Sequence, residues 1–311
     1  MIKNITVAII YILIGWFLNT TWHLPKNQNN PISQIILKPL EKYSIENLSK
    51  TKFKASEIKV DGNLFSFFVE GKKVTGQINI PDGEGPFPVI IMFRGYVDQK
   101  LYKTGDGTRR ASEYFAKNGF ITLAPDFLGY GGSDAEASNI FESRFQTYVT
   151  ALTLINSITQ SSNLPIDQSF IFLWGHSNGG QIALTTLEVT GKNYPTALWA
   201  PVSKPFPYSI LYYTDESDDH GKLIRSELAK FEQNYDVENY SLTNYLDKIV
   251  APIELHQGTN DDAVPTSWSD TLAKRLTNVE YLKHPGADHN LNPAWNQSVS
   301  QSLHFYQKFL Q

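Results

Sequence analysis

The sequence predicts an α/β fold with a mostly parallel central sheet and helices on both faces. Apolar runs alternate with segments of helical periodicity from about residue 89 onward, which is typical of such sheets. Residues 89–93 form a continuous apolar run, as expected for a strand covered on both faces. A serine flanked by glycines, in residues 175–180, stands between an apolar strand pattern and a helix pattern.

Each expected element follows from its local pattern. An antiparallel strand pair comes first, over residues 65–69 and 74–80, with Glu70 and Gly71 near the turn. The expected order is then strand 89–93, helix 109–117, strand 120–123, a helix with apolar residues recurring from Phe141 to Ile155, strand 170–174, a helix carrying Ile182 and Leu187, strands 196–199 and 253–256, helix 267–276, strand 279–282, and a last helix from about Ala294.

One stretch interrupts the alternation after the sixth expected strand. About 45 residues (about 202–246) stand where a short connection is typical. They are rich in Tyr and Phe, and we interpret them as an inserted cap over the strand ends. Its aromatic residues could form a separate small core or contact a substrate. Its acidic residues could be a solvated loop or could capture a substrate amino group; they are Asp215, Glu216, Asp218 and Asp219.

Composition excludes several classes of function. The 311 residues carry a formal charge of −4, without the concentrated basic face that nucleic-acid binding needs, so no nucleic-acid partner is expected. The chain has no cysteine, which excludes disulfides, thiolate metal sites and a cysteine nucleophile. No metal site is predicted, because His284 and Asp288 near His289 lack a ligand cluster. The composition does not indicate an oligomeric state.

The N-terminus predicts export. Lys3 precedes an uncharged apolar run over residues 5–18, which suits a signal peptide or, if it is not cleaved, a membrane anchor. We therefore expect residues 1–25 to be this segment, residues 26–56 a linker or N-terminal extension, and residues 57–311 the α/β domain. The expected location is extracytoplasmic, either secreted or held at the membrane by the N-terminal helix.

Three polar residues carry the predicted chemistry. Ser177 lies in Gly-x-Ser-x-Gly at a strand-to-helix turn, which exposes a hydroxyl and directs backbone N–H groups at a developing oxyanion. A serine nucleophile needs a base and an acid that orients the base. Asp261 and His289 each follow an expected strand, so all three residues should meet at one edge of the sheet.

These motifs resemble the α/β-hydrolases, and most closely the catalytic domain of the prolyl oligopeptidase family of serine peptidases. The resemblance covers about residues 57–311 and includes Arg94-Gly95-Tyr96, residues 125–133, 175–180, 258–265 and 286–289. It implies that the acid is Asp261 and that the base is His289. Asp262, one step out of register, is kept as the second candidate for the acid. It also implies backbone oxyanion donors at Tyr96 and Asn178. Arg94 stands where relatives usually carry histidine.

The resemblance implies a serine hydrolase that cleaves peptide or ester bonds through an acyl-enzyme and needs no cofactor. The substrate would be a small peptide or ester. A peptidase of this family is the first hypothesis. Few residues precede the catalytic region, whereas such peptidases often carry an N-terminal propeller, and this favours the second hypothesis, a carboxylesterase acting on small acyl esters. An inactive, membrane-tethered binding module is the third.

Overall fold

The computed structural model describes residues 38–214 and 217–310. The predicted signal peptide or anchor over residues 1–25 therefore lies outside the described residues, as do residues 26–37 of the expected linker. Asp215 and Glu216 of the cap also lie outside them. In the part of the chain that is described, no helix combines the length and the apolar character needed to cross a membrane.

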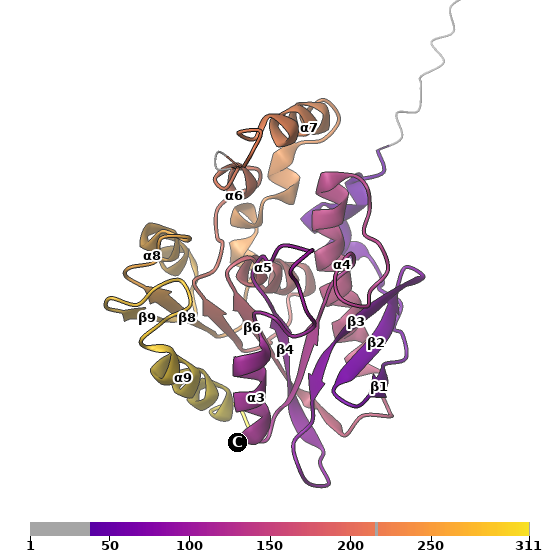
Figure 1. Ribbon diagram of the computed structural model, residues 1–311, viewed down its shortest axis with the longest axis vertical. Coiled ribbons are helices and arrows are strands. Elements are labelled where there is room, and N and C mark those ends of the chain that lie inside the picture. The colour runs from indigo at the N-terminus through magenta and orange to yellow at the C-terminus, as the bar shows by residue number, and fades with distance from the viewer. Residues whose placement is uncertain (1–37, 215–216, 311) are drawn as a thin grey trace, which may run out of the picture. The chain divides into compact units, whose positions relative to one another are not determined.

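A nine-stranded sheet organises the domain (Figure 1). Its strand order is β1-β2-β3-β5-β4-β6-β7-β8-β9. The first three strands run antiparallel to their neighbours and the remaining six are parallel, as the sequence predicts. The strands are β1 (Lys59–Asp61), β2 (Leu64–Val69), β3 (Lys72–Asn79), β4 (Phe87–Phe93), β5 (Ile121–Pro125), β6 (Ile166–His176), β7 (Thr196–Trp199), β8 (Ile253–Gly258) and β9 (Val279–His284).

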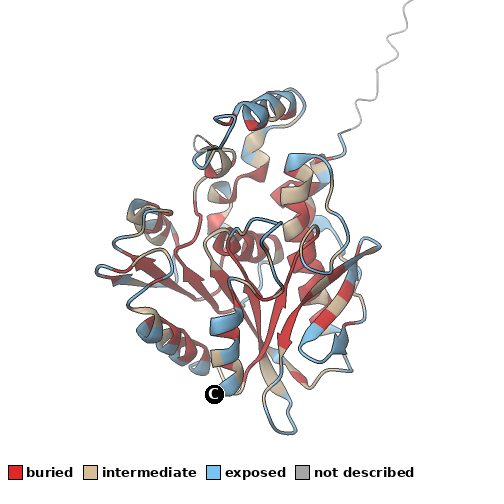
Figure 2. Ribbon diagram, viewed as in Figure 1, coloured by how far each residue is buried: buried red, intermediate tan, exposed pale blue. Residues whose placement is uncertain are grey.

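Helices cover both faces of this sheet. Helices α3 (Arg109–Lys117) and α9 (Trp295–Gln307) share one hydrophobic cluster, whereas α4 (Ile140–Thr159), α5 (Asn178–Thr190) and α8 (Thr266–Arg275) contribute to the other. Figure 2 shows the central strands buried between these layers. Because apolar residues of β4 face both clusters, its uninterrupted apolar run matches burial on both sides.

Two features at the start of the described chain differ from the prediction. The expected linker over residues 26–56 contains a 3₁₀ helix, η1 (Glu41–Tyr43), and helix α2 (Ile45–Lys50), whose apolar residues lie in the main core. The compact unit that contains these helices begins at Pro39. Strand β1 was not predicted, because all three of its residues are exposed and leave no alternating pattern. The cap therefore follows the seventh strand, β7, and not the sixth.

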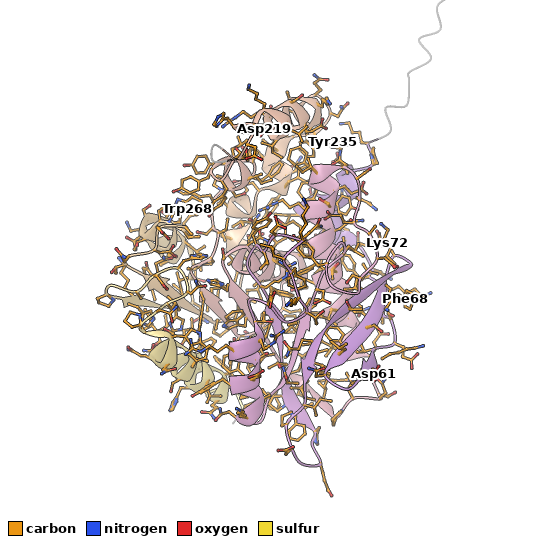
Figure 3. All side chains as sticks on the ribbon, in the orientation of Figure 1. Asp61, Phe68, Lys72, Asp219, Tyr235 and Trp268 are labelled. Carbon is orange, nitrogen blue, oxygen red and sulfur yellow. The ribbon has the colours of Figure 1, made fainter. Side chains whose placement is uncertain are left out.

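The cap contains helices α6 (Tyr208–Leu211) and α7 (Lys222–Glu232) and three 3₁₀ helices, η2 (Val237–Tyr240), η3 (Leu242–Asn244) and η4 (Leu246–Lys248). Its aromatic residues divide into two groups. Phe206, Phe231 and Tyr240 join the main core, where they pack against Phe145 of α4. Tyr208, Tyr212 and Tyr213 surround Trp268 of α8, which Figure 3 labels below Asp219. The first group anchors the cap.

Candidate active site

Ser177 stands at the sharp turn between β6 and α5. Its backbone has φ 55° and ψ −122°, a conformation that costs a non-glycine residue about 1–3 kcal/mol. Neighbouring backbone holds it there: the Ser177 N–H donates to the Trp199 carbonyl at 2.9 Å, and the Val202 N–H donates to the Ser177 carbonyl at 2.9 Å. The strained turn holds the serine where strand β6 ends and helix α5 begins.

Glycines make this turn sterically possible. A Cβ on Gly175 would come within 2.6 Å of the Gly179 carbonyl oxygen. A Cβ on Gly179 would collide with the Phe93 carbonyl oxygen at the end of β4. The glycines in the sequence motif are therefore required by close backbone packing between the helix and two strands.

Asp261 and His289 come from two loops that follow β8 and β9, and the structure brings them into contact. His289 Nδ1 lies 2.9 Å from Asp261 Oδ2 and 3.1 Å from Oδ1. Because a carboxylate only accepts, Nδ1 carries the proton, which leaves Nε2 of a neutral imidazole free to act as a base.

Several donors hold the Asp261 carboxylate in place. Oδ1 accepts hydrogen bonds from the backbone N–H groups of Ala263 and Val264 at 2.9 and 2.8 Å, and Oδ2 accepts from Gln257 Nε2 at 2.9 Å. Burial raises the pKa of Asp261, but the hydrogen bonds outweigh burial and the pKa is lowered overall. Asp261 is therefore ionised at neutral pH. Asp262, the neighbour one step out of register, is exposed.

The backbone N–H groups of Tyr96 and Asn178 have no hydrogen-bond partner among the described residues. Asn178 is the first residue of α5, where helix N–H groups lack a partner within the helix and carry partial positive charge. The loop that carries Tyr96 touches the serine, because a Cβ on Gly95 would lie 3.0 Å from Ser177 Cβ. Both amides therefore belong to segments that adjoin Ser177.

Arg94 has a scaffolding role in this loop. Its buried guanidinium donates from Nη1 to the Gly95 carbonyl at 2.9 Å and from Nη2 to the Asp126 carbonyl at 3.1 Å. It also lies over the rings of Tyr130 and Tyr102, at 4.0 and 4.4 Å from their centroids. Arg94 thus ties the Tyr96 loop to the neighbouring loop.

His176 is a site residue that the sequence prediction missed. Its Nε2 lies 2.9 Å from the His289 carbonyl oxygen. Burial and the nearby His289 lower the pKa of His176 to about 4, so the ring is neutral at neutral pH. No feature of the local sequence distinguishes His176 from a core histidine. The contact with His289 forms because the loop after β9 packs beside the end of β6.

A cavity of about 1080 Å³ opens at this edge of the sheet. Ser177, His289, Asn178 and Tyr96 all line it. The cap supplies much of the remaining wall, with aliphatic and polar side chains. The aliphatic residues that line the cavity are Val97, Ile140, Val202, Ile210, Leu223, Ile224 and Ala263. Within the described ranges, no group of three or more His, Asp or Glu residues could hold a metal ion.

Comparison with known proteins identifies related sequences. A family model described as the prolyl oligopeptidase family matches residues 108–311. Dipeptidyl peptidase family member 6 of Caenorhabditis elegans is 23% identical over 254 residues, which are 75% of this chain and 33% of that protein. The chain therefore spans about a third of the length of this curated relative.

Solved structures share the architecture. Est1E from Butyrivibrio proteoclasticus with bound ferulic acid has a TM-score of 0.58 at 18% identity, covering 79% of this chain and 98% of its own. Acetyl xylan esterase 1 from Thermoanaerobacterium sp. JW/SL YS485 has a TM-score of 0.61 at 15% identity, and the match covers 86% of this chain and 94% of that one. A puromycin-hydrolyzing peptidase from Mycobacterium tuberculosis has a TM-score of 0.57 at 18% identity, and the match covers 77% of this chain and 38% of that one. These similarities confirm the predicted α/β-hydrolase fold.

Proposed function

Because this chain belongs to the prolyl oligopeptidase family, we propose that it is a serine hydrolase that cleaves peptide or ester bonds. The observation that carries the proposal is the 2.9 Å contact between His289 Nδ1 and Asp261 Oδ2, beside a cavity that Ser177 also lines. A base oriented by a carboxylate, beside a serine that a strained turn holds in the cavity wall, is the arrangement that acyl transfer requires.

In the proposed mechanism, the Ser177 hydroxyl attacks the substrate carbonyl while His289 Nε2 accepts the hydroxyl proton. Asp261 keeps Nδ1 protonated and stabilises the imidazolium. The N–H groups of Tyr96 and Asn178 hydrogen-bond the negative oxygen of the tetrahedral intermediate. His289 then gives its proton to the leaving group, which departs and leaves the acyl group on Ser177. In the second half of the reaction, His289 Nε2 takes a proton from a water molecule that attacks the acyl carbonyl, and then returns the proton to the Ser177 oxygen as the acid is released.

A carboxylesterase is the second candidate, favoured by the apolar lining of the cavity, which suits an acyl chain. The family favours a peptidase instead. Turnover of short-chain p-nitrophenyl esters measured against aminoacyl p-nitroanilides separates the two. We expect the esters to react in either case, because they are activated, and efficient anilide cleavage only if the enzyme is a peptidase.

Labelling by a fluorophosphonate tests the proposal itself. We expect stoichiometric labelling of the folded chain and none of Ser177→Ala, because only an activated serine reacts rapidly with this reagent. Ser133→Ala, in a loop beside β3, is the matched control and should label like the wild type. A folded wild-type chain that stays unlabelled would contradict the proposal and favour the binding module.

We also propose an extracytoplasmic location, supported by the apolar run over residues 5–18 after Lys3. Fractionation of cells that express the full chain tests it. Recovery of the protein outside the cytoplasm, or at the membrane, is the expected result. Deletion of residues 2–18 should retain it in the cytoplasm, and a deletion without effect would contradict the proposal.

A further inference from the structure

Arg144 places a positive charge in the wall of the cavity, and no acidic residue in the described part of the chain pairs with it. It lies in the second turn of α4, and its side chain lines the same cavity as Ser177 and His289. Of its three guanidinium nitrogens, Nη2 donates a hydrogen bond at 2.7 Å to Gln181 Oε1. Nε and Nη1 donate to no described residue, and no described carboxylate forms an ion pair with Arg144.

The guanidinium is held in position by a buried chain of hydrogen bonds. Gln181 lies on α5, one helical turn beyond Ser177, and is almost fully buried. Its Nε2 donates at 3.0 Å to the hydroxyl of Tyr148, which lies on α4 and is also buried. Because Gln181 accepts from Arg144 with one end and donates to Tyr148 with the other, its orientation is fixed. The arginine therefore has fewer rotamers to lose when a ligand binds.

The acidic residues of the cavity do not neutralise Arg144. Asp219 uses its carboxylate within the cap: Oδ1 accepts from Gly221 N–H and Ser217 Oγ at 2.9 Å, and Oδ2 accepts from Leu223 N–H at 2.8 Å. Asp218 is exposed and forms no ion pair with a described residue. The hydrogen bonds of the Asp219 carboxylate thus hold it within the cap loop, and none of them involves Arg144.

The apolar wall strengthens the electrostatic effect of the arginine. Ile140 and Ile224 line the same cavity, and so does Tyr213. A cation with few partners, next to apolar side chains, interacts with an incoming anion more strongly than a solvated cation does. The guanidinium also offers two parallel N–H donors in a plane, the geometry that a carboxylate matches.

We propose that Arg144 binds a free carboxylate of the substrate, so that the enzyme prefers acyl compounds bearing a carboxylate at a distance from the scissile bond. This inference rests on the proposed function, because it assigns a substrate class to the same cavity. No covalent step is added: Arg144 orients and retains the substrate while Ser177 reacts. Arg144 is therefore a specificity residue.

Two matched series of esters test the inference on the full chain. In the first, mono-p-nitrophenyl esters of succinate, glutarate and adipate are compared with neutral p-nitrophenyl esters of equal chain length. In the second, the carboxylate is in the leaving group, as acetate esters of hydroxybenzoates compared with phenyl acetate. We expect the wild type to favour the charged member of at least one series, with an optimum chain length that reports the distance from Ser177 to Arg144.

Arg144→Gln should lower kcat/KM for the favoured carboxylate ester about 10- to 100-fold, the loss expected for one charge-assisted contact, mainly through KM. Its kcat/KM for the neutral ester should change less than about threefold, which also shows that the variant is folded. Arg275→Gln is the matched control, since Arg275 is exposed on α8 and does not line the cavity. It should leave both activities unchanged.

The outcomes separate the two proposals. Hydrolysis of neutral esters without any preference for a carboxylate in either series overturns the inference and leaves the proposed function intact. An equal loss on charged and neutral esters in Arg144→Gln also overturns it, because that pattern indicates a purely structural residue. If the folded wild type hydrolyses no ester or anilide and is not labelled by a fluorophosphonate, the proposed function itself fails.

Discussion

His176 and His289 are direct neighbours, although 113 residues separate them in the sequence. Their ring centroids lie 4.7 Å apart, and His176 Nε2 lies 2.9 Å from the His289 carbonyl oxygen. A carbonyl oxygen only accepts, so Nε2 of His176 carries the proton. His176, the residue before Ser177, therefore holds the backbone of the loop that carries His289. This contact links the segment of the proposed nucleophile to the segment of the proposed base.

This contact predicts a positioning role for His176. His176→Phe retains an aromatic ring but loses the donor, and we expect kcat to fall about tenfold with little change in KM, since a displaced base affects the transition state more than binding. His176→Gln, which can still donate, should retain most of the activity. Steady-state kinetics with a p-nitrophenyl ester checks this. Equal kcat values for the two variants would argue against positioning through the hydrogen bond.

Asp261 and Asp262 form a matched pair for testing the proposed acid. Asp261→Asn should reduce kcat by roughly 10³- to 10⁴-fold, because an amide stabilises neither the required tautomer nor the imidazolium. Asp262→Asn should remain within about twofold of the wild type, since its exposed carboxylate does not contact His289. Hydrolysis rates of the two variants show which of the two aspartates is the acid. A larger loss in Asp262→Asn would assign the acid to the other residue.

Glu188 makes stability depend on pH. It is buried on α5, neither of its carboxylate oxygens has a partner among the described residues, and burial raises its pKa well above the ordinary value. The folded chain therefore retains a proton that the unfolded chain loses above its ordinary pKa, so the free energy of unfolding falls as pH rises.

Glu188→Gln removes this proton uptake. We expect the variant to be more stable than the wild type at pH 8 by more than about 1 kcal/mol, and the difference to shrink toward pH 4.5. Urea denaturation at both pH values measures the change. Glu113→Gln, on the exposed face of α3, is the control and should have no such effect. An unchanged pH dependence in Glu188→Gln would show that Glu188 is ionised in the folded state.

His284 has the opposite effect on the pH dependence of stability at acid pH. Burial, with a contribution from His256, lowers the pKa of His284 from 6.5 to about 4. His284 Nε2 lies 2.8 Å from His256 Nδ1, and His256 Nε2 lies 2.7 Å from Glu254 Oε1. Between pH 6.5 and 4 the unfolded chain binds a proton at this histidine that the folded chain does not, so stability falls as pH falls.

His284→Gln should therefore flatten the pH dependence of the unfolding free energy over this range by about one proton, even where the substitution lowers stability at pH 7. His304→Gln, at an exposed position of α9, should leave the slope unchanged. Thermal or urea unfolding at intervals from pH 7 to pH 4 measures both slopes. A variant with the wild-type slope would contradict a lowered pKa at His284.

The sequence predicted helices and strands correctly where burial or a tight turn restricts the residue types within a few positions. The apolar run before Gly175 and the turn at Gly71 both correspond to observed elements, because each reflects packing or backbone geometry within a few residues. Helix α2 was missed, because its six residues are too few to display helical periodicity. Strand β1 was also missed, because its three residues are exposed and show no apolar alternation. It forms a strand by pairing with β2, which its own residues do not indicate.

The sequence by itself determined the mostly parallel α/β architecture and which serine, aspartate and histidine follow its strands, because strand burial and tight turns restrict residue types locally. Only the tertiary structure decided that Asp261 meets His289, that His176 contacts the backbone of His289, and that Arg144 lines the cavity with no acidic partner among the described residues. Those relations join segments far apart in the chain, and their distances arise from how helices and loops pack on the sheet, which no local pattern encodes.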